Sequence, residues 1–400
     1  MKIGVLTYHW VSNFGANLQA LSTYRYLENN GYEPVIINWI PKDVEEKYAN
    51  SVLACQNTAH QQFAKEYFVN ITKVCRTGED IAREIEKEGI EKVLIGSDAV
   101  FTNLPLLARY RLSRRGIVHI NPKSDSRFPN PFWGDFVDYL PRPVKLIAIS
   151  ASAQNMPYKK IWFPNERAGY RKALMRFSHI SVRDVWTRNM IKFVTAGNII
   201  PEITPDPVFA FEQNVKPDCL YYVRKRLGID GKYVLFSAYD TIQDDKWILE
   251  LEALFEECGI TVIGLPKTTI QVFNSPLKYN LTFPISPLEW YDSIKNSDGY
   301  IGELMHPVLV SLHNAVPVYS FDTYGFRKFL KLDVKSSKIY QILSQYNLLS
   351  NYYNRKISHS LPSPSEVFEK IQGFNKTECT SLSIVMTQQY NNMMKKSLSI

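Results

Sequence analysis

Short apolar runs alternate with segments of helical periodicity along most of the chain, and this alternation constrains the fold more than any other feature. The first forty residues contain an apolar strand (2–8), a helix with apolar side chains three to four positions apart (18–30) and a second strand (34–40). Gly31 stands where the C-terminal cap of that helix is expected. Strand, helix and strand joined by short links form a βαβ unit, which predicts a parallel sheet.

The alternation runs in two series, separated by the proline-marked segment 201–217. Because 400 residues exceed the roughly 250–300 that one hydrophobic core serves, two domains are expected. The sequence therefore predicts an α/β fold with two Rossmann-like domains facing each other across a cleft. The predicted units are an N-terminal domain (1–200), a linker (201–217), a C-terminal domain (218–335) and a helical tail (336–400), with tail helices around 336–348, 364–373 and 380–395.

Composition and cysteine spacing exclude several classes of protein. No run approaches the ~20 apolar residues that cross a bilayer. Met1 and Lys2 lead directly into a short strand, so no signal peptide is predicted. The five cysteines form no CxxC or zinc-ligand spacing, which predicts reduced thiols, a cytoplasmic location and no metal site.

Basic residues are concentrated in two stretches of a chain whose net charge is +8. Residues 156–192 carry nine Lys or Arg against two acids, and a second group without an acid comprises Arg109, Arg111, Arg114 and Arg115. Either these stretches are ordinary solvated surface or they contact an anionic partner. No nucleic-acid-binding module accompanies them, so phosphorylated small ligands or anionic lipid headgroups fit better than nucleic acid.

The turn after the first strand is a candidate ligand site. It contains Asn13, Gly15 and Asn17, and it lies between the carboxyl end of a strand and the start of a helix. Exposed backbone N–H groups and the helix dipole favour an anion or a sugar hydroxyl there. A plain tight turn is the alternative. Neither GxGxxG nor a Walker A sequence is present, so nucleotide binding is not indicated.

Two charged residues follow other predicted strands. Asp98, after Ser97, would point from the end of its strand into the cleft, where it could act as a base or hold an acceptor sugar. A helix-capping aspartate is the alternative. Arg183 has a guanidinium that matches carboxylate and phosphate geometry, and an ion pair with the adjacent Asp184 is its alternative.

Two histidines lie in one predicted helix late in the chain. His306 precedes Pro307, which suits the first helical turn, where the helix dipole lowers an imidazole pKa and a bound dianion raises it. His313 is two turns further on, about 10 Å away, which is too far for both to bind one metal. A satisfied interior histidine is the alternative for each.

These segments, in this order, resemble the polysaccharide pyruvyl transferase family. The resemblance rests on NFGANLQALSTYRYLENNGYEPVIIN, VLIGSDAVF, LIAISAS, ISVRDVWTRNMI with DPVF, and SPLEWYDSIKNSDGYIGELMHPVLVSLHNAVPVYSF, which together span about residues 3–325. It implies a glycosyltransferase-B-like pair of domains. It also implies transfer of pyruvate from phosphoenolpyruvate to sugar hydroxyls as a ketal, with no metal or organic cofactor.

The resemblance assigns roles to particular residues. His306 falls on the family's proposed general acid, and Arg183 falls on the arginine that would clamp the donor. Some members have an arginine where this chain has Leu304 and many have glycine where it has Pro307, so Lys267 is a candidate substitute cation. The full expected set is His306 and Asp98 for catalysis, Arg183, Lys267 and His313 for the donor, and Asn13, Gly15, Asn17 and Ser97 for the acceptor.

The expected activity is therefore a pyruvyl (ketal) transferase acting on a cell-surface polysaccharide or lipid-linked glycan precursor. Its donor side lies in the C-terminal domain, and the basic stretches predict peripheral contact with an anionic membrane at its inner face. Two alternatives stay open. One is a glycosyltransferase of the same fold that uses a nucleotide sugar, and the other is a non-catalytic glycan-binding member, which Leu304 suggests.

Overall fold

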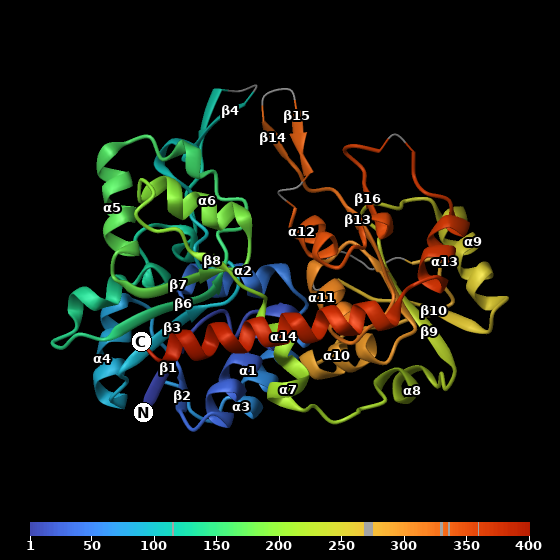
Figure 1. Cartoon of the computed structure of the whole chain (residues 1–400), viewed down its shortest axis with the longest axis horizontal. Helices are drawn as coiled ribbons and strands as arrows, with labels where there is room; N and C mark the ends of the chain where they lie inside the picture. Colours follow the sequence, from blue (N-terminus) through green and yellow to red (C-terminus); the bar gives the residue numbers. More distant parts are fainter. Residues whose placement is uncertain (114–115, 268–274, 329–330, 335–336, 359) are drawn as a thin grey trace.

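The computed structural model describes residues 1–113, 116–267, 275–328, 331–334, 337–358 and 360–400. Each half of the chain forms a six-stranded sheet whose strands all pair in parallel (Figure 1). Helices cover the faces of the sheets, as parallel pairing requires. The predicted α/β architecture with two domains is confirmed.

The first sheet has the strand order β2-β1-β3-β6-β7-β8. Its strands are β1 (Lys2–Leu6), β2 (Glu33–Ile36), β3 (Lys92–Gly96), β6 (Lys145–Ala151), β7 (Phe177–Val182) and β8 (Glu202–Ile203). The α-helices of this half are α1 (Phe14–Asn29), α2 (Lys42–Ser51), α3 (Ala54–Tyr67), α4 (Gly78–Glu88), α5 (Pro164–Leu174) and α6 (Val185–Val194). Asn13 caps α1 by accepting a hydrogen bond from Ala16 N, and Gly31 ends it with a φ of 78°.

The second sheet has the order β11-β10-β9-β12-β13-β16. Its strands are β9 (Lys232–Ser237), β10 (Ile260–Gly264), β11 (Tyr279–Asn280), β12 (Gly299–Gly302), β13 (Val318–Asp322) and β16 (Tyr352–Asn354). The α-helices of this half are α8 (Tyr222–Leu227), α9 (Asp245–Glu256), α10 (Pro287–Lys295), α11 (Met305–His313), α12 (Lys338–Gln345) and α13 (Pro364–Gln372). Two antiparallel hairpins stand apart from the sheets: β4 (Tyr110–Ser113) with β5 (Gly116–His119), and β14 (Phe326–Lys328) with β15 (Lys331–Asp333).

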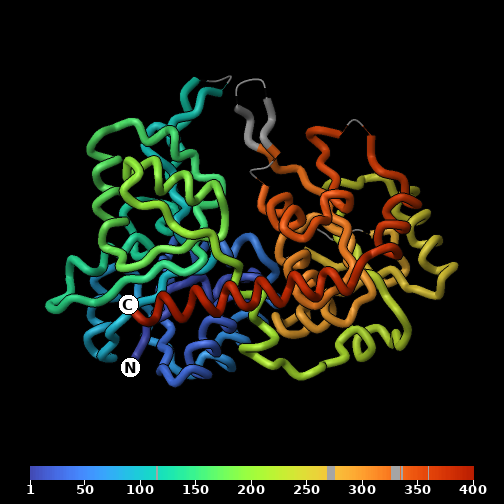
Figure 2. Tube along the Cα trace, viewed as in Figure 1, coloured from blue at the N-terminus to red at the C-terminus, as the bar shows by residue number. Residues whose placement is uncertain are grey.

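The segments expected to be a linker and a helical tail each contribute a strand to a sheet and pack against the domains. Residues 201–217 include β8, the 3-10 helix η6 (Pro207–Ala210) and α7 (Phe211–Val215), the last two packed against α1. The expected helical tail contributes β16 to the second sheet. Its last helix, α14 (Lys376–Leu398), crosses back to the first domain, where Lys92 Nζ donates to Leu398 O at 2.7 Å. Figure 2 shows both chain termini on that domain.

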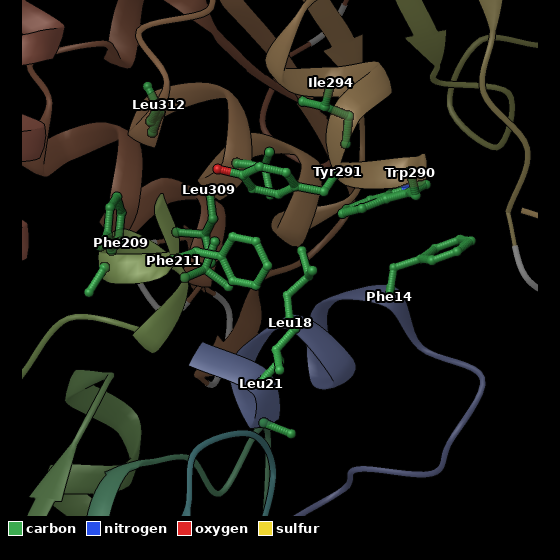
Figure 3. Close-up of a cluster of buried hydrophobic side chains, with 14 of the residues drawn as sticks. Phe14, Leu18, Leu21, Phe209, Phe211, Trp290, Tyr291, Ile294, Leu309 and Leu312 are labelled. Carbon is green, nitrogen blue, oxygen red and sulfur yellow. The ribbon is translucent and has the colours of Figure 1, made fainter. Parts of the chain in front are cut away.

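A continuous apolar core joins the two domains. Helix α1 lies against α10 and α11 of the second half, and Figure 3 shows Phe14 and Leu18 facing Trp290 and Leu309. The Phe14 and Trp290 rings stack with their centroids 4.9 Å apart. Because all four of these side chains are buried, this core fixes the start of α1 against the second domain. None of the described helices is long and apolar enough to span a bilayer.

Candidate functional site

A cavity of about 560 Å³ is lined by residues of both domains, a volume within the range of small-molecule sites. Most lining residues follow the carboxyl end of a strand, and Ser337, Lys338 and Ile339 come from the start of α12. From the first sheet these are Asn13 after β1, Asp98 after β3, Gln154 and Asn155 after β6, and Arg183 after β7. From the second they are residues 303–306 after β12, Tyr324 after β13 and Lys356 after β16. Open parallel sheets bind ligands at this edge, and here two such edges face each other.

The wall formed by the first domain is built around a buried ion-pair cluster. Arg183 Nη2 lies 3.2 Å from Asp98 Oδ1, and Arg183 Nη1 lies 2.7 Å from Asp206 Oδ2. The expected alternative, a pair with the adjacent Asp184, is wrong. Asp184 caps α6 by accepting from Thr187 N at 2.7 Å. Both outer nitrogens of the guanidinium are therefore engaged by carboxylates.

A strained turn presents Asp98 to this cluster. Asp98 has a φ of 68°, a left-handed backbone conformation that residues other than glycine rarely adopt. Gly96, two residues earlier, has a φ of 118°, and a Cβ there would lie 2.4 Å from Ile149 O. Ser97 is buried, and its Oγ accepts a hydrogen bond from Asp98 N. The structure therefore uses Ser97 to hold the turn, and Ser97 does not line the cavity.

His306 lies in the first turn of α11, as predicted, and lines the cavity. A Cβ on Gly15 would stand 2.0 Å from His306 Cγ, so glycine at this position makes room for the imidazole. Gln19 connects the ring to the ion-pair cluster, because its Nε2 lies 3.4 Å from His306 Nε2 and also donates to Asp206 Oδ2. Burial lowers the pKa of His306 to about 4, against the opposing effect of Asp206 and Asp98. The imidazole is therefore neutral at pH 7 when the cavity is empty.

The wall formed by the second domain carries two lysines, and the carboxylate of Glu303, which also lines it, is paired with Lys267. Lys338 is the first residue of α12 and lines the cavity together with the exposed Lys356. Neither ammonium group lies within ion-pair distance of a carboxylate among the described residues. No side chain caps α11, and because Pro307 has no N–H, the helix start offers the N–H groups of Met305 and His306. Burial, followed by the charge of Arg183, lowers the pKa of Lys338 to about 8, so most molecules keep the lysine charged at pH 7.

Three expected site residues lie elsewhere. Lys267 pairs with Glu303 and with Asp240, so its charge is compensated and it does not line the cavity. His313, on the same helix as His306, is half-buried and accepts from Glu212 N at 3.4 Å, away from the cavity. Asn17 is buried, and its amide donates to His9 O at 2.8 Å. The structure thus brings together His306, Asp98, Arg183, Asn13 and Gly15, and it places Lys267, His313 and Asn17, like Ser97, outside the lining of the cavity.

Four residues of the site were not assigned from the sequence. These are Gln19, Asp206, Lys338 and Lys356. Asp206 stands in the DPVF segment and Gln19 in the first long segment quoted above, so both lay within recognised motifs without a role. The two lysines lie after the second series of strands, in the expected tail, where no pattern marks them. Among the described residues no group of three His, Cys, Asp or Glu side chains is placed to hold a metal ion.

Comparisons with known proteins agree with this architecture. A family model described as polysaccharide pyruvyl transferase matches residues 13–324. No curated protein shows significant sequence similarity to the chain.

Solved structures similar to the chain have very different sequences. The UDP-GlcNAc 2-epimerase from Methanocaldococcus jannaschii is 11% identical with a TM-score of 0.52, covering 97% of this chain and 100% of that one. The UDP-N-acetylglucosamine 2-epimerase from Rickettsia bellii is 9% identical with a TM-score of 0.50, covering 100% and 96%. A Glycyrrhiza uralensis protein complexed with glycyrrhetinic acid 3-O-monoglucuronide is 7% identical with a TM-score of 0.51, covering 100% and 95%. These likenesses show a glycosyltransferase-B-like fold and nothing about the ligand.

Proposed function

The chain belongs to the polysaccharide pyruvyl transferase family, and on that premise we propose that it transfers pyruvate from phosphoenolpyruvate to a pair of sugar hydroxyls as a ketal. The acceptor is a cell-surface polysaccharide or its lipid-linked precursor. The observation that carries the proposal is the charge difference between the two walls of the cavity, with His306 between them.

The donor is assigned to the second domain. Phosphoenolpyruvate carries a phosphate and a carboxylate, and the wall beside α11 and α12 offers Lys338, Lys356 and the uncapped start of α11. Ammonium groups and helix N-termini both favour anions. Arg183 is already engaged by two carboxylates, so we assign Lys338 the larger share of the donor charge. Arg183 then positions Asp98 and Asp206.

The acceptor is assigned to the first domain. Asn13, Gln154 and Asn155 line that wall and offer amide groups to sugar hydroxyls. Asp98 uses Oδ1 for Arg183, and no described residue hydrogen-bonds its Oδ2. That oxygen is the proposed acceptor for the proton of an attacking hydroxyl.

His306 is the proposed proton donor to C3 of phosphoenolpyruvate. Because its pKa is about 4 in the empty cavity, it must gain a proton with the donor, whose negative charge raises the pKa of a neighbouring imidazole. Protonation of C3 makes C2 electrophilic, and one sugar hydroxyl adds there. The C2–O bond to phosphate breaks, and the second hydroxyl closes the ketal. Of the two hydroxyl protons released, one balances the proton taken by C3 and the other leaves with phosphate.

The test is phosphate release from phosphoenolpyruvate across a panel of soluble and lipid-linked sugars, with the ketal methyl group followed by NMR. We expect release only with acceptors that present two suitably placed hydroxyls. Turnover of nucleotide sugars instead would support a glycosyltransferase. Acceptor binding without phosphate release would indicate a non-catalytic member of the family.

A further inference from the structure

The hairpin β4–β5 projects from the first domain and exposes apolar side chains. It follows the 3-10 helix η1 (Leu106–Arg109) and points away from the sheet (Figure 1). Leu112 is 84% exposed and Ile117 is 70% exposed, and the strand register pairs these two residues directly. A folded protein seldom leaves paired large aliphatic side chains in water without a partner.

More exposed apolar side chains lie beside the base of the hairpin. The 3-10 helix η5 (Tyr158–Lys160) contacts η1. The residues that follow η5 are Trp162, which is 75% exposed, and Phe163. Glu166 lies on α5, directly after these residues, and its Oε1 accepts a hydrogen bond from Leu106 N at 2.8 Å. This bond joins the segment around residues 161–166 to the base of the hairpin. We call residues 106–113, 116–119 and 158–163 the hairpin surface.

The charge of the hairpin surface has one sign. From residue 104 to residue 124 the sequence contains no Asp or Glu, and Arg111 is exposed. Lys159 and Lys160 of η5 are also exposed. Arg114 and Arg115, which belong to the same predicted basic stretch, lie outside the described residues.

The second predicted basic stretch is only partly available to a partner. Arg167 donates to Phe193 O at 2.5 Å, and Arg176 donates to both carboxylate oxygens of Asp138. These arginines stabilise the first domain internally. Arg111, Lys159 and Lys160 are exposed and lie near the exposed apolar side chains, where an anionic and partly apolar partner would contact both.

We infer that the hairpin surface docks on an anionic lipid bilayer, with Leu112, Ile117 and Trp162 entering the interface. Exposed aliphatic and aromatic groups flanked by lysine and arginine are the combination that binds the headgroup region of such a membrane. A second copy of the chain fits less well, because a symmetric contact through this surface would bring like charges together.

The test is co-sedimentation of the purified chain with phosphatidylcholine vesicles and with vesicles that also contain phosphatidylglycerol. We expect binding to the anionic vesicles only, weakened at about 0.5 M salt by screening. The double variant Leu112→Ser/Ile117→Ser should lower the partition coefficient about tenfold or more, because the apolar contact is lost. The matched control is Leu249→Ser, an exposed leucine on α9 of the other domain, which should bind as the native chain does.

Native binding equal for both vesicle types, absent binding at low salt, or an unaffected double variant would each overturn the inference. Concentration-dependent dimerisation that the double variant abolishes, without vesicle binding, would assign the surface to a second copy. Vesicle binding needs no turnover, so its failure is distinguishable from failure of the proposed function. Thermal unfolding of each variant checks that the domain remains folded.

Discussion

The two walls of the cavity are formed by equivalent edges of two similar sheets, but their charged side chains differ in whether they have ion-pair partners. On the first domain, the two outer nitrogens of Arg183 are paired with Asp98 and Asp206, and the buried Nε has no partner among the described residues. On the second domain, Lys338 and Lys356 have no carboxylate at ion-pair distance within the described structure. The ion pairs of the first wall are preorganised, because they form without a ligand. The two lysines of the second wall have no such partner in the described part of the chain and can bind an anion.

Substitutions on the two walls of the cavity should therefore alter different properties of the protein. His306, between the walls, should matter most for turnover, Arg183 in the ion-pair cluster for stability, and Lys338 on the second wall for donor affinity. The predictions below test that division, beginning with the largest expected effect.

Replacing the histidine between the walls should cost most. His306→Gln should lower turnover by ~10²–10⁴, the usual contribution of a positioned general acid, with a smaller change in donor affinity. Steady-state phosphate release measures this. The matched control is His313→Gln, a half-buried histidine on the same helix that does not line the cavity, and it should keep most of the rate. A His306→Gln variant with more than a third of the native rate would remove His306 from catalysis.

Breaking the ion-pair cluster of Arg183, Asp98 and Asp206 should lower the free energy of unfolding. Arg183→Met leaves Asp98 and Asp206 buried without their counter-ion, which typically costs about 3–5 kcal/mol. Urea denaturation followed by circular dichroism measures the change. The double variant Arg183→Met/Asp206→Asn should recover part of the loss, because one of the stranded charges is removed. If the single variant is as stable as the native chain, the cluster is not what supports this wall.

Removing charge from the other wall should have the reverse pattern. Lys338→Met should raise the KM for phosphoenolpyruvate tenfold or more, since a charge-assisted contact contributes about 1.5–3 kcal/mol. Its free energy of unfolding should stay equal or increase, because burial disfavours the charged lysine in the fold. Donor saturation curves and urea denaturation measure the two effects. An unchanged KM would place the donor elsewhere.

The smallest expected effect is a pH dependence of donor affinity. The folded pKa of Lys338 is about 8, below the ordinary value of 10.5, so the free protein loses this charge as the pH rises through 8. The KM for phosphoenolpyruvate should therefore increase several-fold between pH 7 and pH 9. Lys338→Arg keeps its charge over this range and should flatten the increase. A native and a Lys338→Arg profile of the same shape would exclude this lysine as the titrating group.

The periodicity of the sequence was enough to predict the parallel sheets and to place three cavity residues at the ends of their strands. Asp98, Arg183 and His306 each follow an apolar strand, and parallel strands bring their carboxyl ends to one edge. The partner of Arg183 could not be predicted in the same way. The adjacent Asp184 was the local alternative, but Asp206 stands on a different segment and reaches Arg183 only after the sheet has formed. Local spacing cannot rank partners that are distant in sequence.

The sequence by itself determined the α/β class, the two domains, the family and the residues at the strand ends, because these depend on local periodicity and on motifs of contiguous residues. Only the tertiary structure decided how they are used. Gly15 leaves room for the imidazole of His306 from the other domain. The charge of Lys267 is compensated by Glu303 and Asp240. Lys338 entered the cavity from a segment expected to be a tail. Burial, counter-ions and close approach are properties of pairs of segments, and they exist only once the two domains pack on their shared apolar core.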